Sequence, residues 1–424
     1  MNNCNLNTCL YLFQNNLRLQ DNPSLYYAYF HFWNVVPVLV IPEKANTHLN
    51  EIGQEMGTFR RQFLIEAALD LKASLAKEKI DLIILKEDKN LVSRLKTICK
   101  TYDIEYTVTS YPRGTYEGNL LGALCEFTAV FTCEDDNLVA MEELPFTELP
   151  KVFTPFRKEM EANLDIRDKT QKPLLKKFKD SHKFSDTLEL IQHPKHPNSA
   201  YPFMGGETAA HERLNYYLWE SKAITDYKET RNELIGENYS SKLSAYLALG
   251  NLSPVQVYYA IKDFEAQVEK NDSTYWLLFE LLWREYFLLV ALQGHTKIYS
   301  IQGIQDKEPK NYSNDIKKFE QWCTGNTDHP FINANMKELV ATGYMSNRGR
   351  QNVASYLVHH LKIDWRWGAS FFEKHLIDYD ISLNWCNWMY VAGVGNNTRN
   401  KVFNPTLQQE RYDPDSTYCN LWNQ

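Results

Sequence analysis

The stretch Asp378-Tyr-Asp-Ile-Ser-Leu-Asn-Trp-Cys-Asn-Trp-Met-Tyr390 carries more polar and aromatic groups than a protein core needs. Before it lie the segment Met345-Ser-Asn-Arg-Gly-Arg-Gln-Asn352 and the run Asp364-Trp-Arg366. Burying Arg350 or Asp378 alone would be costly, so we expect these residues to pair or to meet a polar ligand. This part of the chain therefore predicts a binding site among helices.

The residues around these segments, from Gly205 to the end, follow helical periods with almost no strand alternation. Nine of the ten tryptophans lie from Trp219 onward, and filling of helical cores would account for some of them. We expect an all-helical region over 205–424. Its expected helices cover 207–219, 244–248, 254–264, 275–292, 335–339, 350–361 and 367–376, with breaks at Asn251–Pro254 and Gly294–His295.

The first 150 residues instead alternate β-rich runs with helical patterns. The clearest helix covers Thr58–Lys77. This alternation predicts an α/β domain with a doubly wound parallel sheet over 1–150. No G-x-G-x-x-G follows the first strand and no Walker loop occurs, which disfavours a nicotinamide dehydrogenase or a P-loop enzyme. The candidate strands are Cys9–Phe13, Val35–Ile41, Asp81–Leu85, Ile104–Thr109 and Ala129–Thr132.

Residues 151–204 differ from both halves and are rich in Lys, Pro, His and Asp. We interpret them as an interdomain connector with little fixed sheet structure. The basic run Lys176–Lys179 is more often a solvated face than a DNA contact.

Composition limits the function classes further. With a net charge of −7 the charge totals show no general phosphate-binding surface, so any nucleic-acid site must be a local patch. No apolar run is long enough for a membrane helix, and no secretory signal is recognisable at the start. Eight cysteines without C-x-x-C or zinc spacing predict reduced thiols and no metal site. We expect a cytoplasmic protein, associated with the nucleoid if it is bacterial.

Two further segments carry candidate chemistry. Glu280, Trp283 and Arg284 lie at i, i+3 and i+4 of one helix, which places a carboxylate, an aromatic ring and a cation on one face. Taken alone, these residues are better explained by a surface ion pair beside a half-buried tryptophan. Tyr239-Ser-Ser-Lys-Leu-Ser-Ala245 places hydroxyls and free N–H groups ahead of a helix, a phosphate-binding arrangement, although serine caps are also common.

Taken together, these segments resemble the photolyase/cryptochrome family over nearly the full chain, and most closely its DASH-type cryptochromes. They occur in the order that the family shows, which makes the resemblance specific. The segments are Asn16–Asn22, Ser240–Ser244, Phe279–Glu285, Asn347–Gln351, Asp378–Asp380, Asn384–Trp388 and Phe403–Gln408.

The resemblance implies an FAD held in the helical domain. Arg350 and Asp378 match an ion pair over the flavin ring, Asp380 matches the acid beside it, and Asn384 matches the residue that faces flavin N5. The positions that match contacts to the cofactor's phosphates are Tyr227, Ser240, Ser241, Lys242, Leu243 and Ser244.

It also implies light-driven repair of DNA, in which excited reduced FAD passes one electron to a cyclobutane pyrimidine dimer that has left the base stack. Glu280 matches the carboxyl group that bonds the dimer, and Trp283 matches an aromatic wall of its pocket. The other expected DNA contacts are Arg231, Arg284, Asn347, Arg348, Gln351, Tyr390 and Gln408.

Two positions favour the DASH branch. Tyr390 stands where many duplex-repairing members have Trp, and Gln351 stands where they have Met. A smaller, more polar wall gives less stacking to a flipped lesion. We therefore expect a preference for single-stranded DNA, in which unstacking costs little.

A tryptophan relay that resupplies the flavin with electrons is the next implication. Trp388 and Trp365 match its inner and middle members, and the outer position falls on Tyr312. Because tyrosine must lose its proton on oxidation, we expect slower or less complete photoreduction than through three tryptophans. Trp322 is interpreted as a core residue.

Other positions depart from the family pattern or concern a second chromophore. Gln14 and Asn16, like Asp328 and Asn333, differ from the usual residues and put interdomain packing in question. DASH proteins commonly bind a methenyltetrahydrofolate antenna between their domains, and Glu117 lies near the matching position.

The leading hypothesis is thus a deoxyribodipyrimidine photolyase, a monomer that splits pyrimidine dimers, mainly in single-stranded DNA. The alternative is a blue-light photoreceptor that uses the same flavin to change a partner's state. Glu280, Trp283, Asn347 and Arg348 favour repair, because a sensor needs no lesion pocket. A light-independent flavin carrier has no support, since nothing resembles a nicotinamide site.

Overall fold

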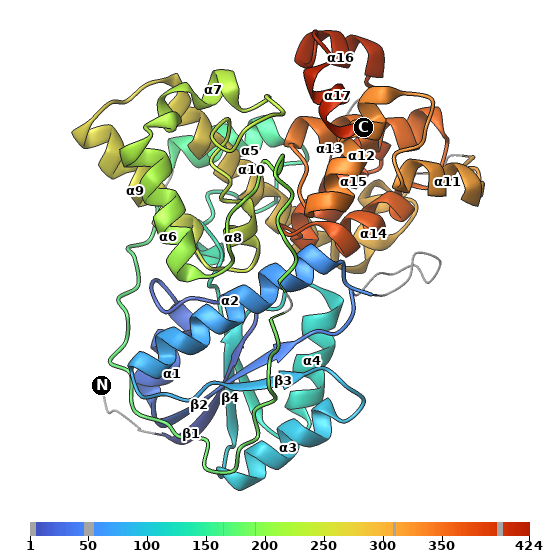
Figure 1. Ribbon diagram of the computed structural model, residues 1–424. Coiled ribbons are helices and arrows are strands. Elements are labelled where there is room, and N and C mark those ends of the chain that lie inside the picture. The colour runs from blue at the N-terminus through green and yellow to red at the C-terminus, as the bar shows by residue number, and fades with distance from the viewer. Residues whose placement is uncertain (1–5, 46–54, 164, 191, 308–310, 397–401) are drawn as a thin grey trace.

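The computed structural model describes residues 6–45, 55–163, 165–190, 192–307, 311–396 and 402–424, and its N-terminal region is a sheet between two helical layers (Figure 1). The strands pair in the order β3-β2-β1-β4-β5, all parallel, which confirms the doubly wound sheet. They are β1 (Leu6–Phe13), β2 (Phe32–Ile41), β3 (Ile83–Lys86), β4 (Tyr106–Ser110) and β5 (Ala129–Cys133). The helices are α1 (Pro23–His31), α2 (Thr58–Lys77), α3 (Leu91–Thr101) and α4 (Thr115–Cys125).

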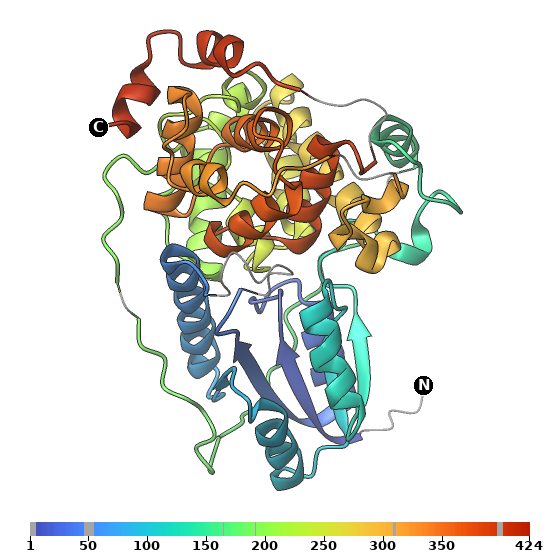
Figure 2. The ribbon, with the colours of Figure 1, turned by 90° about the vertical axis from the view of Figure 1, so that its right-hand side faces the viewer.

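Both faces of this sheet are buried, because alternate side chains of β1 enter different cores. Cys9, Tyr11 and Phe13 pack with α1 and α2. Leu10 and Leu12 pack with α3 and α4 on the opposite face. Figure 2 shows α2 on one side of the strands and α4 on the other. Continuous apolar strands are what a sheet covered on both faces requires.

The C-terminal region is helical, as expected. Both predicted breaks are confirmed: α9 begins at Pro254 behind a capping box formed by Ser253 and Gln256, and α10 ends at Gly294. None of the described helices has the length and apolar composition of a membrane span. The helices are α6 (Glu207–Asn215), α7 (Tyr227–Thr230), α8 (Ser244–Ala248), α9 (Pro254–Gln267), α10 (Asp272–Gly294), α11 (Ile316–Cys323), α12 (Pro330–Thr342), α13 (Asn347–Ser355), α14 (Trp365–His375), α15 (Ile381–Ala392), α16 (Pro405–Tyr412) and α17 (Thr417–Trp422), with π-helical turns at Tyr216–Glu220 and Tyr356–His360.

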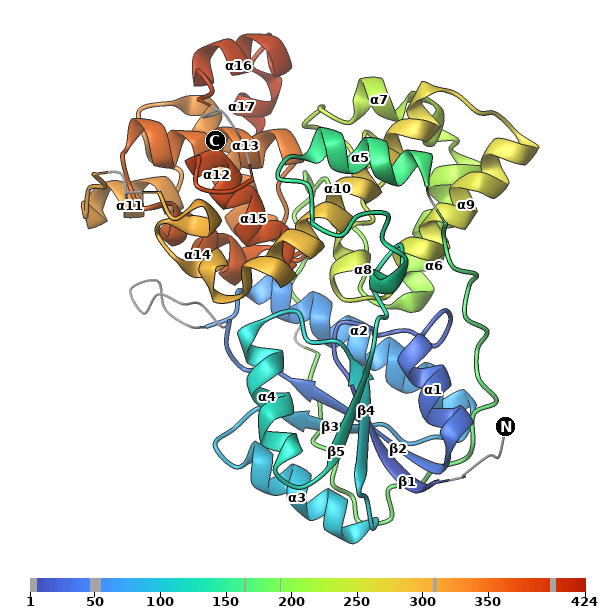
Figure 3. The same ribbon diagram turned by 180° about the vertical axis from the view of Figure 1, so that it is seen from behind.

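The segment 151–204 contains a helix that the sequence pattern did not predict, α5 (Phe153–Ala162). Phe153, Phe156 and Met160 lie on one face of α5 and are buried in the core of the helical region. The rest runs down the α/β region and back, as Figures 1 and 3 show. There the Asp186 carboxylate accepts a bond from the Lys86 N–H at the end of β3, at 2.7 Å.

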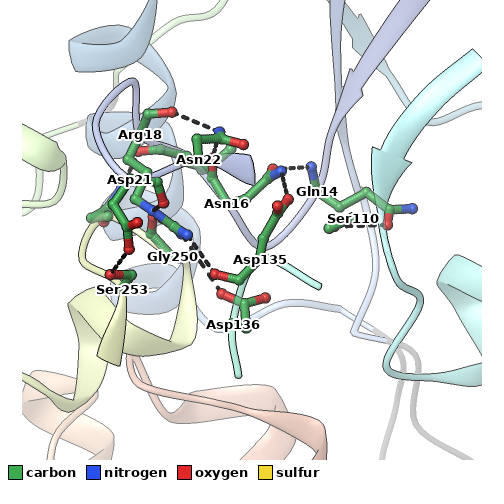
Figure 4. A network of polar contacts seen from close by, with 12 residues as sticks. Gln14, Asn16, Arg18, Asp21, Asn22, Ser110, Asp135, Asp136, Gly250 and Ser253 are labelled. Carbon is green, nitrogen blue, oxygen red and sulfur yellow. Dashed lines mark hydrogen bonds and ion pairs between the residues drawn. The ribbon is translucent and has the colours of Figure 1, made fainter. Parts of the chain in front are cut away.

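The two regions meet at a buried polar seam (Figure 4). Arg18 is fully buried, and its guanidinium donates to the carbonyls of Asp21, Gly250 and Asp135 at 2.9, 3.0 and 2.5 Å. Gly250 has a φ of 65°, and a Cβ there would lie 2.0 Å from the Asn15 carbonyl oxygen. Only glycine fits this approach of the two backbones.

Asn16, whose identity put this packing in question, takes part in the seam. Its amide donates to the Asp135 carboxylate at 2.6 Å, and its side-chain oxygen accepts from the Gln14 N–H at 3.0 Å. Asp21 accepts from the Ser253 hydroxyl and pairs with Arg167 at 2.6 Å. The unusual residue at position 16 therefore leaves the interdomain contacts intact.

Candidate functional site

A buried ion pair joins α13 to the turn before α15, as expected for Arg350 and Asp378. Arg350 Nη2 lies 2.8 Å from Asp378 Oδ2, and the Asp378 side chain is only 2% exposed. The Ser244 hydroxyl donates to the same oxygen at 2.7 Å. The second oxygen, Oδ1, is buried and has no hydrogen-bond partner among the described residues. A carboxylate in this state fits a ligand that donates a hydrogen bond to it.

The serine-rich loop before α8 places a cation below the surface. Lys242 has a φ of 60°, and its side chain is buried, with Nζ 3.1 Å from the centre of the Tyr239 ring. Burial, chiefly, holds the pKa of Lys242 well below its usual range. Among the described residues Lys242 makes no ion pair, although its Nζ donates to the Tyr344 hydroxyl at 3.3 Å. A buried amine with no carboxylate at ion-pair distance among the described residues fits an anionic ligand, which would stabilise its charged form.

The helix after this loop corrects one part of the prediction. Because α8 is a single turn of five residues, its dipole contributes little to phosphate binding. The groups that remain suited to a diphosphate are the hydroxyls and N–H groups of Ser240, Ser241 and Ser244. Leu243 is buried in the apolar core, so only its backbone is available to a ligand. Tyr227, on α7, is also largely buried.

Asp380 and Asn384 lie at the start of α15. Asp380 caps this helix by accepting from the Leu383 N–H at 2.9 Å, and it pairs with Arg113 at 2.7 Å. Arg113 also pairs with Asp136, so Asp380 is tied to the α/β region. The Asn384 amide group donates to the Ala369 carbonyl at 3.0 Å. That bond fixes the amide nitrogen and leaves the amide oxygen for another partner.

Glu280 and Arg231, both expected at the DNA site, form an ion pair with each other. Arg231 directly follows α7, and its guanidinium lies 5.1 Å from the centre of the Trp276 ring. The Glu280 side chain is 29% exposed. Burial raises the pKa of Glu280, and the Arg231 cation acts in the opposite direction. The Glu280 carboxylate is thus accessible to solvent, but it is already paired with Arg231.

The aromatic wall expected at Trp283 has a second layer behind it. Trp283 stacks on Phe153 of α5, with ring centres 3.6 Å apart and planes 11° from parallel. Its other ring neighbours include Tyr390, edge-on at 6.2 Å. Sequence reasoning missed Phe153, because its segment was interpreted as a connector. The apolar spacing of Phe153, Phe156 and Met160 is the signal that would have found it.

A second group of expected DNA contacts gathers around α13. Arg348 donates to the side-chain oxygens of Gln351 and Asn232, both at 2.8 Å, and lies over the Tyr412 ring at 4.7 Å. Asn347, the first residue of α13, is exposed. Gln408 is half-buried and accepts a 3.5 Å bond from Asn352. Except for Asn347, these polar groups come from neighbouring elements and contact one another.

The position of Arg284 in the structure does not fit the DNA contact expected for it. It is 6% exposed, and its guanidinium donates to the Asp136 carbonyl at 2.8 Å, at the interdomain seam. The i+4 spacing from Glu280 was correct for a helix, but a seam of buried acceptors covers this part of the helix. Arg284 therefore belongs to the contact between the two regions.

The expected relay tryptophans are buried on neighbouring helices. Trp388 on α15 lies edge-on to Trp322 at 6.3 Å, and Trp365 at the start of α14 lies edge-on to Trp385 at 5.8 Å. Trp322 is fully buried, as interpreted from the sequence, and its indole donates to the Val353 carbonyl. Tyr312 is partly buried, and its hydroxyl has no hydrogen-bond partner among the described residues.

Comparisons with known proteins agree with this arrangement. Residues 276–423 match the model described as the FAD binding domain of DNA photolyase, and residues 9–175 match the DNA photolyase model. A cryptochrome DASH of Xenopus laevis is 38% identical over 97% of this chain and 81% of its own length. The chain belongs to the photolyase/cryptochrome family. The resemblance inferred from the sequence is confirmed, and the C-terminal region of this family member is an FAD-binding domain.

Other family members extend the comparison. A cryptochrome DASH of Synechocystis is 38% identical over 98% of this chain and 87% of its own length. The crystal structure of a Synechocystis cryptochrome superposes with a TM-score of 0.88 at 35% identity, covering 99% of this chain and 89% of that one. A class III photolyase of Agrobacterium tumefaciens superposes with a TM-score of 0.80 at 25% identity, covering 98% and 86%.

A cavity of about 130 Å³ lies where this family member's two regions meet. Glu117 lines it, as expected for the antenna position, together with Arg60 and Arg113. Arg60 lies over the Tyr379 ring at 4.4 Å and donates to the Glu373 carbonyl. The cavity is therefore polar, with charges of both signs on its walls.

We expect Gly368→Ala to displace Trp388. A Cβ at Gly368 would lie 2.1 Å from Cη2 and 2.5 Å from Cζ3 of that ring. Overpacking of this kind costs about 1–3 kcal/mol, more than the roughly 1 kcal/mol that alanine normally adds to a helix. Urea unfolding should show a net loss of stability and a changed Trp fluorescence. Gly122→Ala on α4, where a Cβ meets nothing within 4 Å, should be neutral or stabilising. Equal effects of the two variants would contradict the steric account.

Proposed function

We propose that this protein is a light-driven lyase that splits cyclobutane pyrimidine dimers in DNA. The observation that carries the proposal is the partly exposed carboxylate of Glu280 one helical turn from Trp283, whose ring lies edge-on to Tyr390, within a family of DNA photolyases. FAD, when bound, supplies the one-electron chemistry. The unpartnered Asp378 oxygen and the buried Lys242 amine, which makes no ion pair among the described residues, support binding of that cofactor beside α13 and the serine loop.

In this proposal the chain's own residues bind and orient the lesion. Glu280 accepts hydrogen bonds from the imide N–H groups of the dimer, and Trp283 offers an aromatic face held flat by Phe153. Arg348 contacts the DNA backbone. Asn384, whose amide nitrogen is fixed by the Ala369 carbonyl, would have its amide oxygen available to accept a hydrogen bond from a bound flavin.

The proposed preference is for single-stranded DNA. A flipped dimer loses its stacking with neighbouring bases, and Tyr390 and Gln351 replace less of that stacking than Trp and Met would. The chain also carries a net charge of −7, so it attracts duplex phosphates weakly at long range. Both features make the cost of extracting a dimer from a duplex hard to offset.

The decisive experiment measures repair directly. Reduced protein is irradiated with oligonucleotides that contain a dimer, single-stranded and duplex in parallel. We expect light-dependent repair, faster on the single strand, and a loss of about 10–100-fold in Glu280→Ala, the value of one or two hydrogen bonds to a charged group. Absence of repair on both substrates would overturn the proposal.

Tyr312→Phe tests the proposed outer member of the relay. Burial raises the pKa of the Tyr312 hydroxyl, and no described group accepts its proton. We therefore expect Tyr312 to donate electrons slowly, and the variant to photoreduce its flavin more slowly still. Flash photolysis measures the rate. An unchanged rate would remove Tyr312 from the route.

An antenna in the interdomain cavity is a second proposed cofactor. Methenyltetrahydrofolate carries a cationic ring system and carboxylates, and Glu117 and Arg60 line the cavity with matching charges, while Arg113 is held by Asp136 and Asp380. Absorbance of the purified protein near the folate band, lost in Glu117→Gln, would support this assignment.

The cryptochrome names of the relatives favour one alternative, a blue-light photoreceptor without repair. The same irradiation experiment separates the two functions. A photoreceptor would photoreduce its flavin normally and leave the dimer intact, with Glu280→Ala indistinguishable from the parent protein.

A further inference from the structure

The ion pair between Arg231 and Glu280 brings together two groups that DNA and its lesion would each need. Arg231 Nη1 donates to Glu280 Oε1, and both side chains are partly exposed, at 22% and 29%. Arg231 Nε is buried without a hydrogen-bond partner among the described residues. The guanidinium is held between the Glu280 carboxylate and the Trp276 ring, both on α10.

The other arginine of this surface is held differently. Arg348 donates to neutral acceptors, the side-chain oxygens of Gln351 and Asn232. Burial lowers the pKa of Arg348, as does the Arg231 cation, so the two guanidinium groups lie close enough to interact. One cation of the surface is therefore neutralised by a carboxylate and the other is not.

We propose that the Arg231–Glu280 pair is a latch that restrains binding of undamaged DNA and that a dimer opens by taking the Glu280 carboxylate. This inference rests on the proposed function. Glu280 engages Nη1 of Arg231 and Nε is buried, so a phosphate that takes up the guanidinium competes with the Glu280 carboxylate for its charge. In undamaged DNA the bases stay stacked, so nothing replaces Arg231 on a carboxylate whose protonation burial already favours.

A flipped dimer changes this balance, because its imide N–H groups replace the guanidinium at Glu280. Arg231 is then free to contact a phosphate without leaving a carboxylate unpaired. The pair thus adds to specificity because it weakens binding of undamaged DNA. Glu280 alone would act only by binding the dimer.

A double-mutant cycle on DNA binding tests the latch. Affinity for an undamaged, fluorescently labelled single-stranded oligonucleotide is measured by anisotropy in the dark, with holoprotein. We expect Glu280→Gln to bind this oligonucleotide about three- to tenfold more tightly, because a partly exposed pair contributes up to roughly 1 kcal/mol or slightly more. In the Arg231→Gln background the same change should have no effect. The glutamine keeps the side-chain shape, so folding and flavin content, checked by melting and absorbance, should be unaffected.

Arg348→Gln provides the matched control for this cycle. It also removes a surface cation, but one without a carboxylate partner, so Glu280→Gln should still tighten binding in its background. Tightening that persists with Arg231→Gln would show a general effect of charge and overturn the latch, as would no tightening in Glu280→Gln. Repair by the parent protein, assayed beside these variants, separates the two proposals: parent repair without coupling overturns the latch alone, whereas absence of repair by the parent protein overturns the proposed function.

Discussion

Arg350→Leu is expected to purify with little flavin and with reduced stability. The substitution leaves the Asp378 carboxylate, 2% exposed, with only the Ser244 hydroxyl as a partner. Removing one member of a buried pair costs up to roughly 3–5 kcal/mol, and less here because Arg350 is 23% exposed. We also expect an affinity for FAD at least about tenfold weaker, equivalent to about 1.4 kcal/mol. Flavin absorbance relative to protein and a titration of apoprotein with FAD measure this loss.

The pair between Arg366 and Asp364 supplies a control for Arg350→Leu. It has similar geometry, at 2.7 Å, and similar exposure, at 26% and 8%, but it caps α14 away from the serine loop. Arg366→Leu should lower stability and leave flavin content near that of the parent protein. Equal flavin loss in both variants would indicate general unfolding and would remove Arg350 from the cofactor site.

Trp388→Phe is expected to abolish most photoreduction while flavin remains bound. The Trp388 ring is buried on α15, and phenylalanine is much harder to oxidise than an indole. Stability should fall by less than the roughly 3–5 kcal/mol of a Trp-to-Ala change, since most of the core volume is retained. The rate of flavin reduction under blue light with an external donor is the measurement. Chemically reduced Trp388→Phe should still repair a dimer.

Trp385→Phe is the matched control for the relay. Trp385 is fully buried on the same helix, and its indole donates to the Tyr379 hydroxyl at 3.2 Å. It should lose comparable stability and keep photoreduction. If both variants lost photoreduction equally, the effect would come from packing of α15, and the electron route would have to be drawn again.

The features of this structure that the sequence predicts are those that depend on residues close together in the chain. Period-two and period-3.6 patterns gave the strands, α2 and the helix breaks, because those patterns depend on neighbouring residues. The pairing of Arg350 with Asp378 was expected from the family resemblance, whereas the cost of burying single charges left open either a pair or a polar ligand. The parallel, doubly wound sheet follows from the alternation of strands and helices once both faces must be covered, but the order of its strands does not.

The errors concern which neighbour covers a given face. Arg284 has the helical spacing of a site residue, yet the distant Asp136 carbonyl takes its guanidinium. Phe153 lies in a segment rich in charge and proline, yet it stacks on Trp283. The contact of Trp388 with Trp322 also joins separate helices. Such contacts are set by packing between elements, about which a local pattern says nothing.

The seam built on Arg18 and Gly250 fixes the relative position of the two regions. That position would decide how excitation energy passes from a chromophore in the interdomain cavity to the helical region. The Arg18 guanidinium is fully buried among carbonyls, and the backbone at Gly250 meets that of Asn15 with no room for a methyl group. Two lobes joined in this way cannot swing apart as a hinge without exposing charge and opening voids. A chromophore in the interdomain cavity would therefore keep a constant separation and orientation toward the helical site. Excitation energy would cross by resonance through a rigid joint, with an efficiency fixed by the fold.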